Sequence, residues 1–473
     1  MPSRPAFPSH SSGSPSSTSA GGGRSSRRTV LAAGAAAGSA AFLAACGIGT
    51  AAPQGSTKGA GQTLKDQKLT FLHWWTDALG PGYNDMMAWS ATAFKERTGA
   101  QVELVDGKTG GGLNEKFLAM STAGTPPDVS FMSVVIGRDD YDAGLLKNLS
   151  PSIAKTPDLS DKEFFDSSKK FRAKGNETFG IPTMGPESLG FIINSGLFSA
   201  VGLDPQGKDL KTWDDFAKAA QKMTKGSGDA MSQIGVLVGN LSLSWLSAWL
   251  YSNGAQLTNA EETKYLLDAQ PVREVVQYSA DLISKYQASP KFDSPARPAN
   301  ARQALIAGQA AIIYDESAIG LLNAPPDFKF WFIPLPKGPR GSGLASSTWT
   351  NFVSVAKDSK TPDAAVEWIR WFTSVEAHIG RMKFRPVKGA NPRVKLYDTP
   401  EWKDWVKENP ILAFIPEAAK LPGPYPYLRY NRIDADVAPI MRNMINGTTG
   451  INEGLADAQK KADQIMSEPV RVQ

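Results

Sequence analysis

Strand-type and helix-type segments alternate along the chain from residue 68 onward, and this alternation restricts the fold more than any other feature of the sequence. Buried-strand patterns at 68–74, 101–105 and 128–132 are separated by helical spacing at 84–98 and 113–122. Such an alternation is typical of βαβ units, in which helices cover a largely parallel sheet. The sequence therefore predicts an α/β fold.

The alternation continues less regularly through the second half of the chain. Further helices are expected at 212–224, 241–251, 272–286, 302–307 and 362–372, and further strands at 310–314, 329–334 and 352–356. A length of 473 residues is sufficient for two to three domain-sized units.

Open parallel sheets bind ligands beyond the carboxyl ends of their strands. In this sequence that rule points to the three loops that follow the first three strands, at 74–80, 106–112 and 133–140. We expect these loops to supply part of a ligand site.

The N-terminal 45 residues have the three parts of an export signal. A Ser-, Gly- and Pro-rich start leads to Arg27 and Arg28, and a weakly apolar Ala/Gly stretch then runs from 32 to 45. The paired arginines resemble a twin-arginine signal. A transmembrane helix is the alternative, but the apolar run is shorter than the roughly 20 strongly apolar residues that a span needs.

This run ends at the single cysteine of the chain. Leu43-Ala44-Ala45-Cys46 resembles a bacterial lipobox, in which the cysteine becomes the first mature residue and carries diacylglycerol. A buried cysteine at this place by chance is the alternative. Two acyl chains anchor a protein stably to a membrane. We expect a lipoprotein signal peptide at 1–45, lipidation of Cys46, a flexible tether at 46–63, and a position on the outer face of the cell membrane.

The charge balance argues against a nucleic-acid-binding protein. The chain has 51 Lys and Arg residues against 46 acids, and four of its arginines lie in the first 45 residues, leaving 47 against 46. A near-neutral body lacks the clustered positive charge that nucleic-acid binding requires. One cysteine also excludes an internal disulfide and a cysteine-based zinc site.

Several short motifs occur in an order that resembles a known family. They are FKERTGAQV at 94–102, AGTPPDV at 123–129, GIP at 180–182 followed by FIIN at 191–194, TWDDF at 212–216, IAGQAA at 306–311 and RPV at 385–387. Together they resemble family 1 of the extracellular solute-binding proteins, the maltose-binding-protein-like group, over about residues 68–465. In this family the Pro and Arg of the last motif more often occur in a different order.

The resemblance implies a periplasmic-binding-protein-like fold, with two α/β lobes joined by a multi-strand hinge and a sugar bound in the cleft between them. Lobe 1 is expected at 64–182 plus 333–380, and lobe 2 at 183–332 plus 381–467. Closure of such lobes is a hinge motion. The implied function is the substrate-binding component of an ABC importer, whose partners are a sugar or oligosaccharide and the permease transmembrane subunits. We expect a monomer without a cofactor.

A sugar presents an apolar ring face and a fringe of hydroxyls, so aromatic planes and short polar side chains are its natural partners. Trp74 and Trp75 follow the first strand, and one of them is expected at the cleft rim, with core packing as the alternative. Asp77 is a candidate hydroxyl acceptor, and Ser133 begins the loop after the third strand. Glu187 matches a family carboxylate at the crossing between the lobes.

Three further candidates belong to the expected second lobe. Trp245 and Trp249 are four residues apart and share one helical face, which is normally core packing, although one of them can stack on a sugar. Asp315 lies in a polar loop after a strand, where many family members have a Gly-Trp pair.

The remaining candidates lie nearer the C-terminus. Trp349 and Asn351 follow a Gly/Ser-rich stretch and precede a strand, as expected of a ligand loop. Arg385 could reach hydroxyls or a carboxylate of the ligand, or form a structural salt bridge.

No catalytic residue or metal ligand is expected. The glycines at 110–112 lack the Gly-Lys-Ser/Thr of a phosphate loop. His73 and His378 have no ligand partner at a usable spacing, and the adjacent acid pairs do not form the opposed carboxylates of a glycosidase. The alternatives that remain are a secreted carbohydrate-active enzyme and a surface lipoprotein without a transport role.

Overall fold

The computed structural model describes residues 64–108, 112–239, 242–315, 321, 324–385, 390–421, 423 and 426–470, apart from the side chains of 186–188. All of them belong to one compact unit, Ala60–Gln473. The predicted signal peptide, Cys46 and the tether lie outside the described residues, as does the side chain of Glu187.

One large sheet forms the centre of this unit. Its strands are β1 (Lys68–His73), β2 (Gln101–Asp106), β3 (Val129–Met132), β6 (Ile181–Asn194), β7 (Ile234–Leu237), β8 (Ala310–Asp315), β9 (Phe330–Ile333) and β10 (Ser347–Val355). The strand order is β2-β1-β3-β10-β6-β8-β7, and β9 also pairs with β6. A separate short sheet pairs β4 (Ala173–Lys174) with β5 (Glu177–Thr178).

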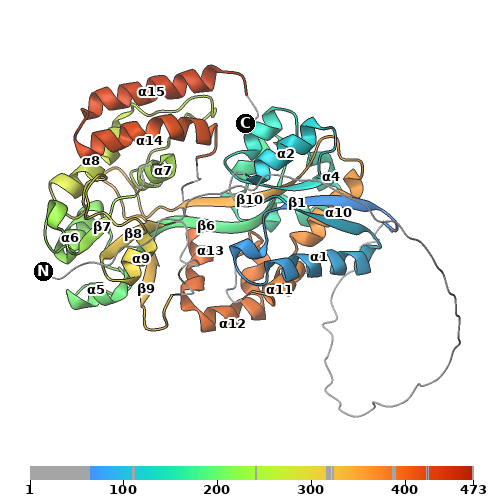
Figure 1. Cartoon of the computed structure of the whole chain (residues 1–473), viewed down its shortest axis with the longest axis horizontal. Helices are drawn as coiled ribbons and strands as arrows, with labels where there is room; N and C mark the ends of the chain where they lie inside the picture. The colour runs from blue at the N-terminus through green and yellow to red at the C-terminus, as the bar shows by residue number, and fades with distance from the viewer. Residues whose placement is uncertain are drawn as a thin grey trace, which may run out of the picture. The chain divides into compact units, whose positions relative to one another are not determined.

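The large sheet consists of two groups of strands that share β6. In the first group β1 is parallel to β2 and β3, and β10 is antiparallel to β3 and to β6. In the second group β8 and β9 are antiparallel to β6, and β7 is parallel to β8. Figure 1 shows β6 and β10 running side by side from one group toward the other. These two strands are therefore the main connection between the groups.

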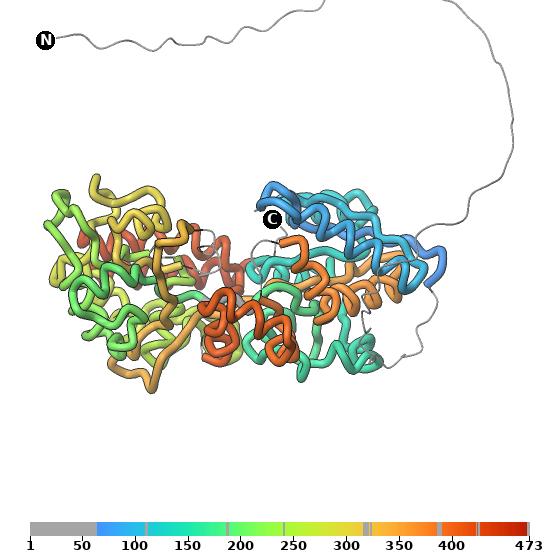
Figure 2. The backbone as a smooth tube through the Cα atoms, turned by 90° about the horizontal axis from the view of Figure 1, so that it is seen from below, coloured from blue at the N-terminus to red at the C-terminus, as the bar shows by residue number. Residues whose placement is uncertain are grey.

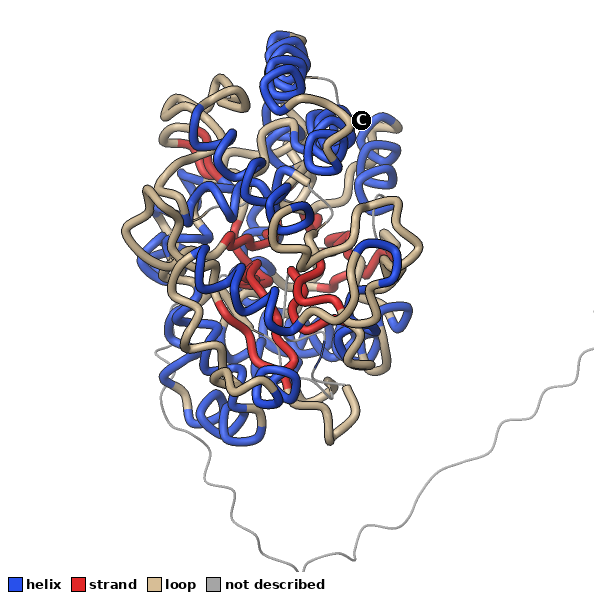
Figure 3. Tube along the Cα trace, turned by 90° about the vertical axis from the view of Figure 1, so that its left-hand side faces the viewer, coloured by secondary structure: helices blue, strands red, loops and turns tan. Residues whose placement is uncertain are grey.

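Helices cover both groups, and the strands lie in the interior (Figure 3). The α-helices are α1 (Tyr83–Thr98), α2 (Gly112–Thr122), α3 (Gly137–Asp142), α4 (Ser150–Ala154), α5 (Ser195–Ala200), α6 (Trp213–Met223), α7 (Leu243–Ser252), α8 (Gln270–Ser284), α9 (Ala301–Ile306), α10 (Pro362–Phe372), α11 (Val375–Met382), α12 (Pro400–Glu408), α13 (Phe414–Ala418), α14 (Tyr430–Asn446) and α15 (Ile451–Ser467). The 3-10 helices are η1 (Asp77–Leu79), η2 (Pro157–Leu159), η3 (Asp161–Glu163), η4 (Asp166–Ser168), η5 (Lys170–Arg172), η6 (Gly228–Ala230), η8 (Val394–Asp398) and η9 (Pro410–Ala413).

Local sequence signals explain where several of these helices begin and end. The side chain of Thr212 accepts the backbone N–H of Asp215, and the carboxylate of Asp215 accepts the backbone N–H of Thr212, so a capping box opens α6. Gly99, at a φ of 82°, ends α1 in the left-handed conformation that glycine adopts without strain. These signals are local, so the sequence predicted both ends correctly.

Segments that are distant in the chain complete each group. Figure 2 shows the blue and cyan segments from residue 64 onward and α10 gathered on one side, with the green and yellow segments, α14 and α15 on the other. In the first group Phe71 contacts Phe131, Trp368 and Phe372. In the second, Phe191 contacts Phe216 and Trp249. Each group therefore has its own set of aromatic contacts, within one hydrophobic core that includes residues of both groups.

Candidate functional site

The carboxyl ends of strands from both groups face the middle of β6 and β10. β3 ends at Met132, which is paired with Phe352, and β8 ends at Asp315, which is paired with Gly190. Between these points β6 and β10 pair with each other across an irregular stretch. Because ligands bind beyond the carboxyl ends of parallel strands, this stretch is where both groups can present ligand-binding loops.

A cavity of about 370 Å³ lies at the carboxyl ends of β7 and β8. It is lined by Leu189, Leu237, Val238, Gly239, Ser242, Ser244, Arg297, Pro298, Ala299, Ala301, Tyr314, Asp315 and Tyr430. We refer to it as the β7–β8 cavity. Its size lies within the range of small-molecule sites in proteins, and its lining combines aliphatic groups with hydroxyls and charges.

Hydrogen bonds within the protein fix the polar side chains on one side of the β7–β8 cavity. Arg302 binds Asp315 through two hydrogen bonds, of 2.5 and 2.7 Å. The hydroxyl of Tyr314 donates to the carbonyl of Ser244 at 3.2 Å. The side chain of Ser242 caps the start of α7 by accepting the N–H of Trp245. These bonds fix the orientation of acceptors and donors before any ligand arrives.

Arg297 contributes a positive charge to the same cavity. One guanidinium nitrogen donates to the carbonyl of Val238 at 2.6 Å, and the group lies 4.2 Å from the ring centre of Phe292. Burial, together with the nearby charge of Arg442, lowers the pKa of Arg297 to about 10. The side chain therefore stays charged at neutral pH.

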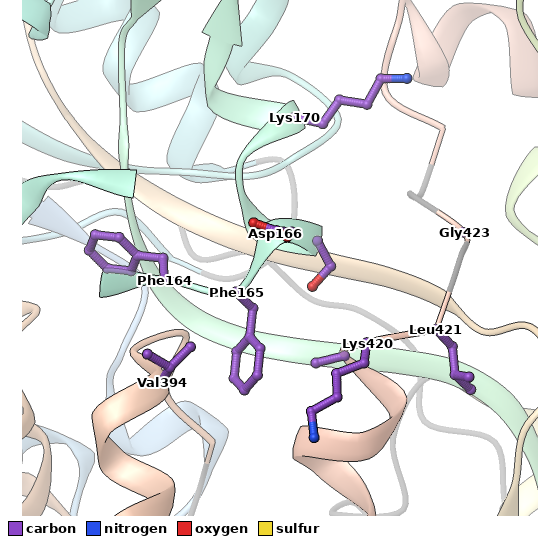
Figure 4. Close-up of a pocket in the computed structure, with 10 residues that line it drawn as sticks. Phe164, Phe165, Asp166, Lys170, Val394, Lys420, Leu421 and Gly423 are labelled. Atoms are coloured by element: carbon purple, nitrogen blue, oxygen red, sulfur yellow. The ribbon is translucent and has the colours of Figure 1, made fainter. Parts of the chain in front are cut away.

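A second cavity, of about 600 Å³, lies beside the edge of β10 (Figure 4). We refer to it as the β10-edge cavity. Phe164 and Phe165 line it from one side, and Lys420 and Leu421 line it from another. The N–H of Thr348 donates to the carbonyl of Gly423 at 2.7 Å, which holds the stretch after α13 against β10. The cavity thus combines aromatic and aliphatic surface with lysine ammonium groups.

The predicted residues after β1 and β3 have different environments. Trp74 is half-buried and stacks on Phe131 at 5.2 Å between ring centres. Trp75 is buried against Phe131 and the core. Asp77 is exposed and exchanges hydrogen bonds with Asn84 at the start of α1. Half-buried Ser133 accepts the N–H of Gly137 through its backbone carbonyl.

Trp245 and Trp249 are both buried in the core of the second group. Trp249 has no exposed surface and packs against Phe191, Trp213 and Phe216. Trp245 is 1% exposed and contacts Tyr314, which lines the β7–β8 cavity. Trp245 therefore supports the wall of the cavity from behind, and Trp249 packs against Trp245.

The crossing strands carry three more of the predicted residues. Trp349 is half-buried and its backbone pairs with that of Glu187. Asn351 is 5% exposed, and its side-chain oxygen accepts the N–H of Val134 at 3.2 Å. These residues lie in the irregular stretch between the two groups. Asn351 thereby ties that stretch to the loop after β3.

Arg385 lies away from both cavities. Its guanidinium is 3.6 Å from the ring centre of Tyr83 at the start of α1. Partial burial lowers its pKa, although the charge of Tyr83 acts in the opposite direction. Of the predicted residues whose side chains are described, Asp315 alone lines the β7–β8 cavity, and none lines the β10-edge cavity.

Sequence reasoning missed several residues that line the cavities, among them Ser242, Ser244, Arg297 and Tyr430. They come from segments up to about 190 residues apart, and none is part of a motif. The one signal that could have indicated Ser242 is its position as the cap of a helix that follows a strand.

Neither a metal site nor a membrane span was found in the described part of the chain. No group of three or more His, Cys, Asp or Glu side chains there is placed to hold a metal ion. No helix among the same residues is both long and apolar enough to cross a bilayer. His73, at the end of β1, is buried, which lowers its pKa to about 4 and keeps it neutral.

A mixed α/β unit whose two groups of strands are joined by long crossing strands, with cavities beside the crossing, has the architecture of a two-part ligand-binding protein. The sequence profile of the bacterial extracellular solute-binding proteins matches residues 80–379. The chain belongs to this family.

Known proteins agree with this assignment. An arabinooligosaccharide-binding protein of Bacillus subtilis (strain 168) is 25% identical over 267 residues, which are 55% of this chain and 58% of that protein. The chain thus matches little more than half the length of this curated relative.

Solved structures share the fold. The sugar-binding protein MalE of Xanthomonas citri has a TM-score of 0.71 at 14% identity, covering 85% of this chain and 98% of the other. An ABC substrate-binding protein of Listeria monocytogenes in complex with cycloalternan has a TM-score of 0.69 at 16% identity, covering 85% and 99%. The predicted periplasmic-binding-protein-like fold is confirmed.

Proposed function

We propose that the protein is the substrate-binding component of an ABC importer, which binds a sugar or oligosaccharide and delivers it to a membrane permease. The observation that carries this proposal is the β7–β8 cavity, where Asp315 and Arg302 form a fixed polar edge at the carboxyl ends of two parallel strands. Carboxylate, hydroxyl and guanidinium groups match the hydroxyl fringe of a sugar. Relatives that bind arabinooligosaccharides and cycloalternan support the same ligand class.

The proposed mechanism is capture between two lobes, 64–182 plus 333–380 and 183–332 plus 381–467. Two contacts favour small changes to these boundaries. Gly338 and Gly341 lie against Ser252 of α7, which supports assigning 335–345 to the second lobe. Arg393 donates to the carbonyl of Thr373 at 2.6 Å, which supports assigning 391–398 to the first lobe.

We propose the ligand contacts as follows. Asp315 accepts ligand hydroxyls, and Trp74 and Trp349, which are half-buried rather than enclosed, are the aromatic surfaces best placed for a ring face. Ser133 and Asn351 border the same crossing region.

The other predicted residues fit less directly. Glu187 is retained because its backbone pairs with Trp349 in the crossing strands. Trp75, Trp245 and Trp249 are proposed to support the site from the core, since all three are buried. Asp77 and Arg385 lie beside the start of α1 and would reach ligand only at the rim.

We propose that the protein is exported through its twin-arginine-type signal and anchored by diacylglycerol on Cys46. The family is described as extracellular, which agrees with export. A single cysteine at the end of an apolar run, after paired arginines, supports the anchor. In this proposal the protein acts as a monomer, without a cofactor and without catalysis.

A ligand screen tests the function. Thermal-shift measurements over neutral oligosaccharides, followed by calorimetry and thin-layer detection of products, should find a sugar that binds and remains intact. X-ray scattering should show compaction when that sugar is added. Cleavage of the sugar would support a carbohydrate-active enzyme, and the absence of binding to any sugar would support a non-transport surface lipoprotein.

A further inference from the structure

Glu262 forms ion pairs that connect the two groups of strands. These ion pairs lie outside the hydrogen-bonded sheet. Glu262 lies in the connection between α7 and α8, which belongs to the second group. Its carboxylate is 2.8 Å from the Nζ atom of Lys170 and 3.7 Å from the Nη1 atom of Arg138. Arg138 lies in α3, directly after β3, and Lys170 begins η5, so both cations belong to the first group. This contact exists only while the two groups lie close together.

The carboxylate is presented by a tightly bonded loop. Glu262 has a φ of 57°, in the left-handed region that non-glycine residues rarely adopt, and its N–H donates to the carbonyl of Asn259 at 3.1 Å. The side-chain oxygen of Asn259 accepts the N–H groups of Thr263 and Lys264, both at 2.9 Å. The loop is thus fixed by its own hydrogen bonds, and strained at the residue that makes the contact.

The cationic side is also held in place independently. The Nε atom of Arg138 donates to Asp142 at 3.2 Å, and Lys174 lies 2.6 Å from the other oxygen of Asp142. Arg138 therefore points toward the second group without help from Glu262. The side chain of Arg138 is 13% exposed and that of Glu262 is 19% exposed. This partial burial shields the Arg138–Glu262 pair from solvent more than an ordinary surface ion pair, whereas the side chain of Lys170 is 39% exposed.

An aromatic contact lies beside the ionic one. Tyr427 is 5% exposed, and its ring meets Phe171 of η5 edge-on at 5.7 Å between ring centres. Burial and the adjacent carboxylate of Glu262 raise the pKa of Tyr427. Tyr251 of α7 also has a pKa raised by burial and by Glu262. The carboxylate of Glu262 thus pairs with two cations, and its negative charge acts on two tyrosines.

We propose that Glu262 is a positioning residue, which forms with Arg138 and Lys170 an ionic latch that favours the closed arrangement of the two lobes before sugar binds. This inference rests on the proposed two-lobe capture of a sugar. If the closed arrangement is the one that holds ligand, the apparent affinity scales with the fraction of molecules that are closed. The latch would raise that fraction without touching the sugar, since Glu262 does not line the β7–β8 cavity.

The experiment measures the distance between the lobes in the absence of sugar. Two spin labels are placed at exposed positions, Glu115→Cys in α2 and Lys222→Cys in α6, with Cys46→Ser to remove the single native cysteine. Pulsed electron spin resonance then gives the distance distribution. Glu262→Gln is compared with Glu274→Gln, which removes an ion pair with Arg340 in the same part of the chain.

The latch predicts that Glu262→Gln increases the population at longer distances, whereas Glu274→Gln leaves the distribution unchanged. In the labelled protein that keeps Glu262, about 1 M salt should also increase the population at longer distances, because the Debye length falls to about 3 Å. The Glu262→Gln distribution should respond to salt much less. With the identified sugar, Glu262→Gln should weaken apparent binding about 3-fold or more, in proportion to the loss of closed molecules.

Lys170→Met tests the same contact from the other side, and combining it with Glu262→Gln should open the molecule little further than either change alone. Unchanged distances in both single variants would overturn the latch. Weaker sugar binding by Glu262→Gln without any change in the sugar-free distances would also overturn it, since it would make Glu262 a ligand contact. A labelled protein that binds no sugar contradicts the proposed function, whereas the sugar-free comparison still decides the latch.

Discussion

At the scale of single residues, Asp315 is the side chain on which the proposed sugar site depends most. Asp315→Asn keeps the size of the side chain but removes a charged acceptor and leaves Arg302 without its two-bond partner. Hydrogen bonds to charged groups contribute about 1.5–3 kcal/mol. We expect binding of the identified sugar to weaken by about that amount in calorimetry.

The control for this change is Asp457→Asn, which alters an exposed carboxylate on α15. It should leave both affinity and melting temperature unchanged. Undiminished sugar affinity in Asp315→Asn would remove this residue from the proposed site.

Trp249 distinguishes a core residue from a ligand contact. It is fully buried among Phe191, Trp213 and Phe216. Trp249→Ala should lower the free energy of unfolding by about 3–5 kcal/mol, as expected for the truncation of a large buried aromatic residue. Urea unfolding should show this loss equally with and without sugar. A stable variant with lost binding would instead indicate that Trp249 contacts the ligand.

Asp140 of α3 makes stability depend on pH. Burial, with a smaller contribution from Asp139, raises its pKa to about 7, and one carboxyl oxygen is buried without a hydrogen-bond partner. The folded protein therefore holds a proton that the unfolded chain releases near its ordinary pKa of 3.8. Between these two values the folded state binds more protons, so this group contributes less stability as the pH rises.

Asp140→Asn removes that dependence, because an amide does not titrate. Relative to the variant, the unsubstituted protein should lose stability on the order of 1–3 kcal/mol between pH 4 and pH 7. Denaturant unfolding across this range measures the difference. If the free energies of unfolding of the two proteins differed by the same amount at all pH values, the pH dependence assigned to Asp140 would be contradicted.

At the scale of elements, the capping box at the start of α6 should contribute measurably to the free energy of unfolding. Thr212→Ala removes the side-chain acceptor of the capping box, and the hydroxyl that donates to Asp215. Loss of such a cap costs about 1 kcal/mol of folding free energy. Gln221→Ala, at an exposed position of the same helix, is the control. Equal unfolding free energies for the two variants would show that the capping box contributes nothing.

Elements defined by local pattern were predictable, and elements defined by pairing were not. The sequence predicted α1 and α10 nearly to the residue, because their apolar spacing and their caps are local. It did not predict β6 as one continuous strand. Pro182, Gly185 and Pro186 interrupt the strand pattern, yet pairing with β10 carries the chain through them.

The same distinction explains the site. Asp315 was predicted because a polar residue directly follows a recognisable strand. Tyr430 and Arg297 reach the β7–β8 cavity from segments that only the tertiary fold brings together. That a residue is a tryptophan does not show whether it is half-buried, as Trp74 is, or fully buried, as Trp249 is. Exposure is decided by packing between distant segments, and a single sequence carries no local signal for it.

At the scale of the whole molecule, attachment to a membrane would determine where the captured sugar is released. The prediction rests on Leu43-Ala44-Ala45-Cys46 at the end of the apolar run. Cys46→Ser removes the thiol that would carry diacylglycerol. Since each buried methylene contributes about 0.8 kcal/mol, loss of two acyl chains should convert a membrane-bound protein into an unanchored one.

Metabolic labelling with a fatty acid, followed by separation of membrane and soluble fractions, measures this directly. The unsubstituted chain should be labelled and sediment with membranes, and Cys46→Ser should be neither labelled nor retained. Ser39→Ala, in the same apolar run, is the control and should behave as the unsubstituted chain. Because this substitution changes no residue that lines the β7–β8 cavity, purified Cys46→Ser should bind the identified sugar with unchanged affinity. Labelling of Cys46→Ser would contradict the anchor.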